Sequence, residues 1–154
     1  MIKSSFIVTL LFAVFMLMTA CADYQPSQIN YGKESCAYCK MNIVEKQFGT
    51  QLINKKGKKY YFDSIECLAA ITIKQEELKN NTHSMWVTNF EQPDQFINIE
   101  DAIFLYGGTV HSPMGIGLLA VRDDMQAQKL LNTFGAEIID WQKTNEIVKY
   151  TWDL

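Results

Sequence analysis

The chain has 154 residues, 48% of them hydrophobic, and a formal net charge of −3 at pH 7. Its 14 basic and 17 acidic residues exclude a strongly basic protein of the kind that binds nucleic acid, so we expect no nucleic-acid partner. The length fits one compact domain or two very small ones.

An uncharged apolar run, FIVTLLFAVFMLMTA, covers residues 6–20. It is shorter than the roughly 20 residues that a membrane-spanning helix needs, and Lys3 precedes it, as in a secretory signal peptide. The sequence from Met18 to Cys21, MTAC, resembles the lipobox of bacterial lipoproteins, whose cysteine is acylated after cleavage. We therefore predict a cleaved lipoprotein signal peptide over residues 1–20 and lipidation of Cys21.

Lipidation of Cys21 would anchor the mature protein to a membrane of the cell envelope, facing the periplasm or the exterior. Two alternatives are an uncleaved anchor and an ordinary signal peptide in which Cys21 is incidental. The segment 21–35 is polar and contains Pro26 and Gly32. It is predicted to form a linker between the lipidated cysteine and the folded part of the protein.

The segment 36–90 predicts a first ββαβ unit. Its strands are expected over 42–53, 58–62 and 84–90. The helix lies between the second and third strands, with Asp63 as its N-cap, because Glu66 follows three residues later as in a capping box. Phe62 and Cys67 then occupy hydrophobic-staple positions, which makes Cys67 most simply a small buried hydrophobic residue.

The segment 91–154 predicts a second ββαβ unit followed by a C-terminal tail that includes a short helix. Its strands are expected over 96–106, 115–122 and 136–142. Asp123 is the predicted N-cap of the helix, and Gly135 is placed for a left-handed C-cap. The expected fold class is therefore α+β, with two small ββαβ units packed together.

The stretch CAYCKM, residues 36–41, holds two thiols and a thioether. If the backbone is extended there, Cys39 and Met41 point to the same side. Thiolate and thioether are soft ligands that favour Cu(I), so these two residues are the primary candidate ligands. Zinc is the weaker candidate, because it usually takes four thiolate or imidazole ligands.

Cys36 and Cys39 also form a C-x-x-C motif, which raises thiol–disulfide chemistry. Redox motifs of this kind open a helix within a βαβ context, whereas this one precedes a predicted strand. Cys36 is therefore either a metal ligand or the redox partner of Cys39, and a disulfide between them stays open. Three cysteines follow Cys21, an odd number that indicates at least one free thiol in an oxidising compartment.

The segment HSPMGIG, residues 111–117, supplies two further donors that copper accepts, His111 and Met114. The alternative interpretation is an ordinary one: a methionine that fills the core and a solvated loop histidine.

Three segments together, CAYCKMNI, YYFDSIECLA and HSPMGIGLLAV, resemble the NosL family of copper-binding lipoproteins, which are accessory factors for nitrous oxide reductase. The resemblance covers about residues 35–142. It implies Cu(I) binding through Cys39 and Met41, supports Met114 as a further ligand or gating residue, and implies a fold of two ββαβ halves related to organomercurial lyase. It assigns no role to Cys36 or Cys67.

These observations predict a non-enzymatic, membrane-tethered Cu(I) metallochaperone. Its expected partners are an exported copper enzyme, nitrous oxide reductase foremost, or the ABC-type assembly machinery of that enzyme. The alternatives are a periplasmic thiol–disulfide oxidoreductase that uses the C-x-x-C pair, and a structural lipoprotein with an inert disulfide. Organomercurial cleavage is a weaker alternative, because no second catalytic cysteine is placed for it.

Overall fold

The computed structural model describes residues 22–154. The predicted signal peptide and Cys21 lie outside the described residues, so lipidation stays a prediction. In chain order the elements are β1 Thr50–Asn54, β2 Lys59–Phe62, α2 Ile65–Lys74, α3 Glu76–Asn80, β3 Thr82–Asn89, β4 Gln92–Asn98, β5 Ile103–Tyr106, β6 Leu118–Val121, α4 Asp124–Phe134, β7 Glu137–Ile139 and α5 Trp141–Thr151. Within this part of the chain, every helix is too short or too polar to cross a bilayer.

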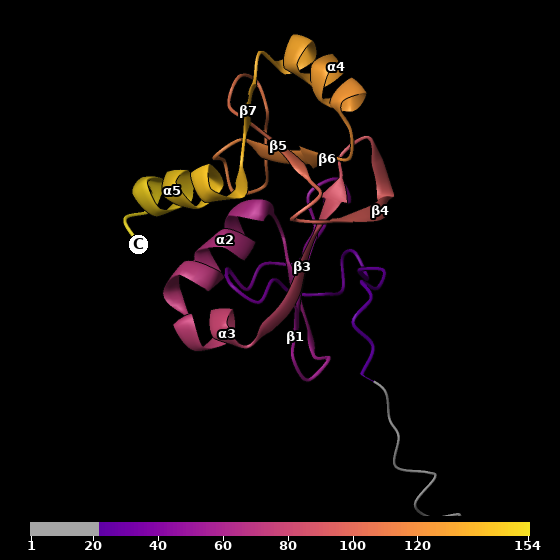
Figure 1. The fold of residues 1–154 in the computed structure, drawn as a ribbon, viewed down its shortest axis with the longest axis vertical. Helices are drawn as coiled ribbons and strands as arrows, with labels where there is room; N and C mark the ends of the chain where they lie inside the picture. Colours follow the sequence, from indigo (N-terminus) through magenta and orange to yellow (C-terminus); the bar gives the residue numbers. More distant parts are fainter. Residues whose placement is uncertain (1–21) are drawn as a thin grey trace, which may run out of the picture.

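Two antiparallel sheets form the framework (Figure 1). The first has the order β2-β1-β3-β4 and the second the order β6-β5-β7. The predicted α+β class and both ββαβ units are confirmed: β1, β2, α2 and β3 form the first unit, and β5, β6, α4 and β7 form the second. The additional strand β4 pairs with β3 and extends the first sheet.

Strands β5 and β6 of the second sheet are buried on both faces, and their side chains alternate between two cores. Phe104 and Leu118 face a large core that also contains residues of α2 and β1. Leu105 and Leu119, one position along in each strand, face a smaller core under α4. This period of two is what a pleated strand produces when both of its faces are covered. The two units therefore share one large core, and the second unit has a further, smaller core under α4.

The helices begin and end where capping chemistry allows. In α4 the Asp123 side chain accepts a hydrogen bond from the backbone N–H of Gln126, and Gly135 is left-handed with φ 66°, so both predicted caps are confirmed. In α2 the predicted N-cap is wrong by one residue. Ser64, and not Asp63, has the extended cap conformation and accepts from the N–H of Cys67.

Three predicted strands have different bounds in the structure. β1 begins only at Thr50, because residues 46–48 form a turn before it. The predicted strand over 96–106 is split into β4 and β5, which belong to different sheets. The predicted strand over 136–142 ends at Ile139, because Asp140 caps α5 and accepts from the N–H of Lys143. The tail is therefore a helix of 11 residues, which packs against α2 (Figure 1).

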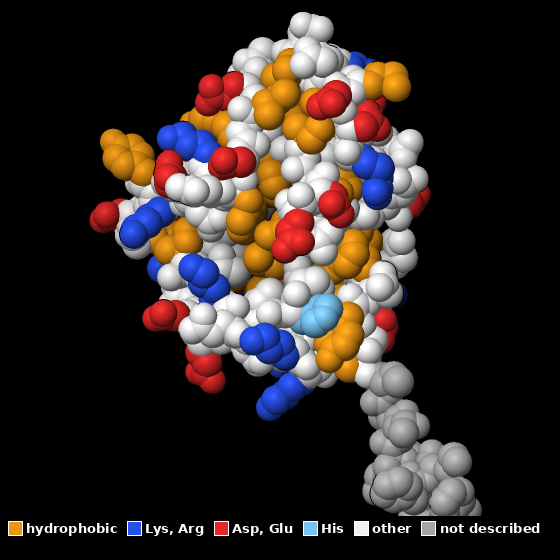
Figure 2. All heavy atoms as spheres, viewed as in Figure 1, with side chains coloured by type: hydrophobic (Ala, Val, Ile, Leu, Met, Phe, Trp, Pro, Cys, Tyr) orange, Lys and Arg blue, Asp and Glu red, His pale blue; other side chains and the backbone are white. Residues whose placement is uncertain are grey.

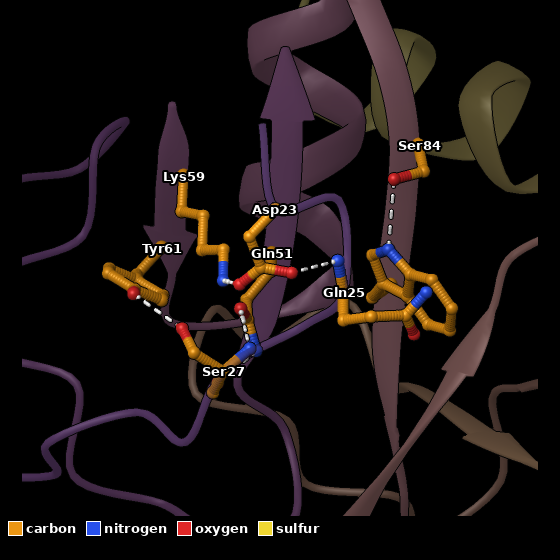
Figure 3. Close-up of polar contacts among 8 residues, drawn as sticks. Asp23, Gln25, Ser27, Gln51, Lys59, Tyr61 and Ser84 are labelled. Carbon is orange, nitrogen blue, oxygen red and sulfur yellow. Dashed lines mark hydrogen bonds and ion pairs between the residues drawn. The ribbon is translucent and has the colours of Figure 1, made fainter. Parts of the chain in front are cut away.

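The segment predicted as a linker lies against the first sheet. Ile29 is buried in the large core. The Gln51 side chain on β1 accepts from the N–H of Ser27 at 3.0 Å and donates to its carbonyl at 2.7 Å. Ser27 also bonds the Tyr61 hydroxyl at 2.8 Å (Figure 3). All five residues of β1 are buried, since α2 contacts the strand and this segment packs along it.

Candidate metal centre

Three thiols converge at the start of α2. The Sγ atoms of Cys36, Cys39 and Cys67 all lie within 4.8 Å of one another, and all three thiols are free. Cys36 and Cys39 belong to a turn that precedes β1, while Cys67 is in the first turn of α2. Cys36 and Cys67 are buried and Cys39 is partly exposed, so the cluster is open to solvent at Cys39.

The backbone of CAYCKM is a tight turn, so the extended conformation expected for it is wrong. The N–H of Lys40 donates to the carbonyl of Cys36 at 3.1 Å, and the N–H of Cys36 donates to the carbonyl of Met41 at 2.8 Å. Lys40 has φ 67°, a left-handed conformation that a residue other than glycine adopts only when its surroundings impose it. A bond from the N–H of Ala37 to the carbonyl of Tyr61, 2.8 Å long, ties the turn to β2.

This turn favours a thiolate at Cys36. The hydrogen bond from the Cys67 thiol is the largest cause that lowers the pKa of Cys36, to about 5, and burial opposes it. Backbone hydrogen bonds from Asp63, Cys39 and Tyr38 also contribute to this lowered pKa. Backbone N–H groups that converge on one atom in this way form an anion site, and they stabilise sulfur as the charged donor that a metal requires.

The other two thiols hold their protons more firmly. Burial raises the pKa of the Cys39 thiol, and the hydrogen bond to Cys36 is the main cause that raises the pKa of Cys67. Ionisation is therefore favoured at Cys36 and disfavoured at Cys39 and Cys67, and any thiol that binds a cation releases its proton.

Two buried carboxyl groups lie behind the thiols. Burial, and after it the nearby Cys36, raise the pKa of Asp63 to about 6. Burial also raises the pKa of Glu66, whose Oε1 accepts a hydrogen bond from the Ser112 hydroxyl. The N–H of Gly117 donates to that same hydroxyl at 2.9 Å. The loop that contains Met114 is therefore fixed to the residue next to Cys67.

The C-terminal residues cover the cysteine turn. Tyr38, between the two cysteines of the motif, stacks on Trp152 with ring centroids 5.8 Å apart and planes 6° apart. On α2, the ammonium group of Lys74 lies 5.9 Å from the centre of the Tyr38 ring. The turn is therefore held by two contacts, the stacking of Tyr38 on Trp152 and the hydrogen bond from Ala37 to the carbonyl of Tyr61.

The other predicted ligands have different surroundings. Met41 directly follows the turn, and 57% of it is exposed. Met114 is half-buried against the large core that contains Cys36 and Cys67. His111 is exposed and lines a separate hollow with Phe48 and Phe90. The structure thus groups Cys36 and Cys39 with Cys67, which the sequence interpretation treated as a hydrophobic residue. The odd cysteine count was the one signal that pointed to it.

The model of the NosL family matches residues 26–148, which include all three thiols and the loop of Met114. The chain belongs to the NosL family. The resemblance based on the three sequence segments is thereby confirmed.

Among solved structures, this NosL-family protein is similar to the crystal structure of the copper chaperone NosL from Shewanella denitrificans. The match has a TM-score of 0.66 at 18% sequence identity and covers 78% of this chain and 96% of that one. At this identity the match demonstrates a shared fold. No curated protein matches the chain.

Proposed function

We propose that this protein is a Cu(I) chaperone, tethered to a membrane of the cell envelope through lipidated Cys21. The convergence of three free thiols within 4.8 Å is the observation that carries the proposal. Metal–thiolate bonds of about 2.3 Å place the sulfur atoms of a trigonal site about 4 Å apart, so small side-chain movements would suffice to bind an ion. Sulfur ligands in low number suit Cu(I) better than harder cations.

Cys39 and Met41 are the proposed ligands at the entrance, with Cys36 and Cys67 behind them. Cys39 is partly exposed and Met41 is more than half exposed, so a partner's ligand can reach the ion from that side. Met114 is a reserve ligand because its loop is held beside the first turn of α2. His111 is the weakest of the predicted ligands, because it lines a different hollow.

Copper leaves by ligand exchange in this proposal, with no covalent chemistry in the protein. The proposed recipient is an exported copper enzyme, nitrous oxide reductase foremost, or its ABC-type assembly machinery. The family membership and the fold shared with a copper chaperone support this assignment.

A thiol–disulfide oxidoreductase is the less favoured function. Its attacking thiol has to be both ionised and accessible. Cys36 has the lowered pKa but is only 1% exposed, while the pKa of the more accessible Cys39 is raised. Neither Cys36 nor Cys39 therefore combines a lowered pKa with the accessibility that an attacking thiol needs.

Titration of the reduced apo-protein with Cu(I), against a chromophoric Cu(I) chelator, tests the proposal. We expect one equivalent to bind, and we expect Cys39→Ser and Cys67→Ser each to weaken binding by at least about tenfold, or about 1.4 kcal/mol. Met41→Leu should weaken it less. Met125→Leu is the matched control, because Met125 is 81% exposed on α4.

Unchanged Cu(I) affinity in both cysteine variants would contradict the proposed site. Zinc that displaces Cu(I) from the unmodified protein would contradict the choice of metal.

A further inference from the structure

The first described residues lie on the turn between β1 and β2. Gly57, in that turn, is so close to Ala22 that a Cβ on it would lie 3.1 Å from the Cβ of Ala22. Asp23 forms an ion pair with Lys59 on β2 at 2.7 Å (Figure 3). The first described residues, Ala22 and Asp23, therefore lie at this end of the first sheet.

Tyr24 fixes the segment a second time at the same end. Its hydroxyl donates to the carbonyl of Lys55 at 3.0 Å, and its ring stacks on His83 of β3 with centroids 3.9 Å apart. The bonds between Ser27 and Gln51 follow three residues later. Consecutive Cα atoms are about 3.8 Å apart, so a lipid on Cys21 begins within one residue of the turn, with no flexible spacer after it.

The same turn is strongly basic. Four of the 14 basic residues of the chain lie between 55 and 59, in the run KKGKK, and the next acidic residue is Asp63. Lys55, Lys56 and Lys58 are exposed, whereas Lys59 is paired with Asp23. Figure 2 shows basic side chains at the lower end of the molecule, near the point where the described chain begins, with acidic side chains to their left. The turn is positive although the chain as a whole has a net charge of −3.

The thiols lie at the opposite end of the first sheet. β1 runs from Thr50 to Asn54, and Asn54 begins the basic turn. Thr50 pairs with Phe62, next to Tyr61, whose carbonyl receives the N–H of Ala37 in the cysteine turn. Five strand residues at about 3.3 Å each separate the two ends by roughly 16 Å.

We propose that the β1–β2 turn rests on anionic phospholipid headgroups, which orients the protein with Cys39 and Met41 away from the bilayer. The proposal rests on the proposed lipid anchor at Cys21. The anchor holds the turn at the surface, and Lys55, Lys56 and Lys58 add electrostatic attraction that acts within a Debye length of about 8 Å. A copper recipient would then approach from the aqueous side.

Lysine acetylation of the mature lipidated protein in vesicles tests this orientation. One set of vesicles contains phosphatidylcholine alone and the other contains phosphatidylcholine with phosphatidylglycerol. Mass spectrometry then gives the labelling rate of each lysine. We expect Lys55, Lys56 and Lys58 to be labelled several-fold more slowly in the anionic vesicles, and high salt to reduce the difference.

Lys33, Lys46 and Lys149 are matched controls in the same molecule, because all three are exposed and lie outside the turn. Lys40 reports on the thiol end, and we expect these four rates to be the same in both vesicles. Equal rates at the turn lysines, slowing at Lys40 and Lys46 instead, or a mature protein without acyl chains on Cys21 would each overturn the proposal. Cu(I) titration of the same sample measures metal binding independently of the orientation on the membrane.

Discussion

The two ββαβ units have the same order of elements but use their helices differently. In α2, eight of the ten residues are buried, from Ile65 to Thr72. In α4, only Ala127 and Leu130 are buried, and Met125 in its first turn is 81% exposed. The difference arises outside the units, because α5 packs on α2 while α4 lies against its own sheet (Figure 1). In this protein the thiol cluster thus lies at α2, the helix that α5 encloses, and not at the more exposed helix α4.

Truncation of one leucine in each helix should give the largest difference. Leu68→Ala on α2 removes a fully buried side chain and should lower the free energy of unfolding by about 3 kcal/mol. Leu131→Ala on α4 removes a half-buried side chain and should cost about 1 kcal/mol. Urea unfolding measures both, and equal losses would show that the two helices are enclosed alike.

The contact between the units should have the next largest effect. Ser112→Ala removes the hydroxyl that donates to Glu66 and leaves a carboxyl group buried without that partner. We expect a loss of about 2 kcal/mol. In a double-mutant cycle with Glu66→Gln, additive losses would mean that Ser112 and Glu66 are not coupled.

Removal of the N-cap side chains should give a smaller difference in stability loss between the two helices. Asp123→Ala should cost about 1 kcal/mol, because water can replace the exposed cap. Ser64→Ala should cost about 1.5 kcal/mol, because Ser64 and the N–H of Cys67 are both buried. Urea denaturation of both variants checks the order, and a larger loss for Asp123→Ala would reverse it.

Substitutions at the C-terminal ends of the two helices should together cost the least stability. Gly135, after α4, has φ 66°, so Gly135→Ala should cost about 1 kcal/mol. Gln75, after α2, has φ −117°, and Gln75→Ala should leave the stability nearly unchanged. Thermal unfolding compares the pair, and a harmless Gly135→Ala would show that the left-handed cap is not needed.

Features that depend on neighbouring residues could be predicted from the sequence. The helix that Asp123 and Gly135 delimit has both of its caps within the same short stretch, and both are correct. The α+β class followed from the same kind of local pattern. The predicted N-cap Asp63 was wrong because Ser64 is an equally good cap one residue later, and local chemistry does not choose between them.

The candidate site depends on contacts between residues that are distant in the sequence. Local sequence patterns do not predict such contacts. Cys67 follows Cys39 by 28 residues and meets it only because the cysteine turn is bonded to β2, just before α2. The turn itself bends because of that bond and the stacking of Tyr38 on Trp152, whereas spacing alone suggested an extended chain. The segment 22–35 looked like a linker because it is polar, whereas its backbone at Ser27 bonds the Gln51 side chain of β1, a strand that only the fold provides.

The stacking of Trp152 on Tyr38 also sets an order of assembly. A ribosome makes residues 36–41 more than 100 residues before Trp152, so the cysteine turn is synthesised long before its packing partner exists. Until then Tyr38 lacks the ring that packs on it. A chain that stops short of Trp152 would keep Cys36, Cys39 and Cys67 and still lack the partner that holds the turn of the first two.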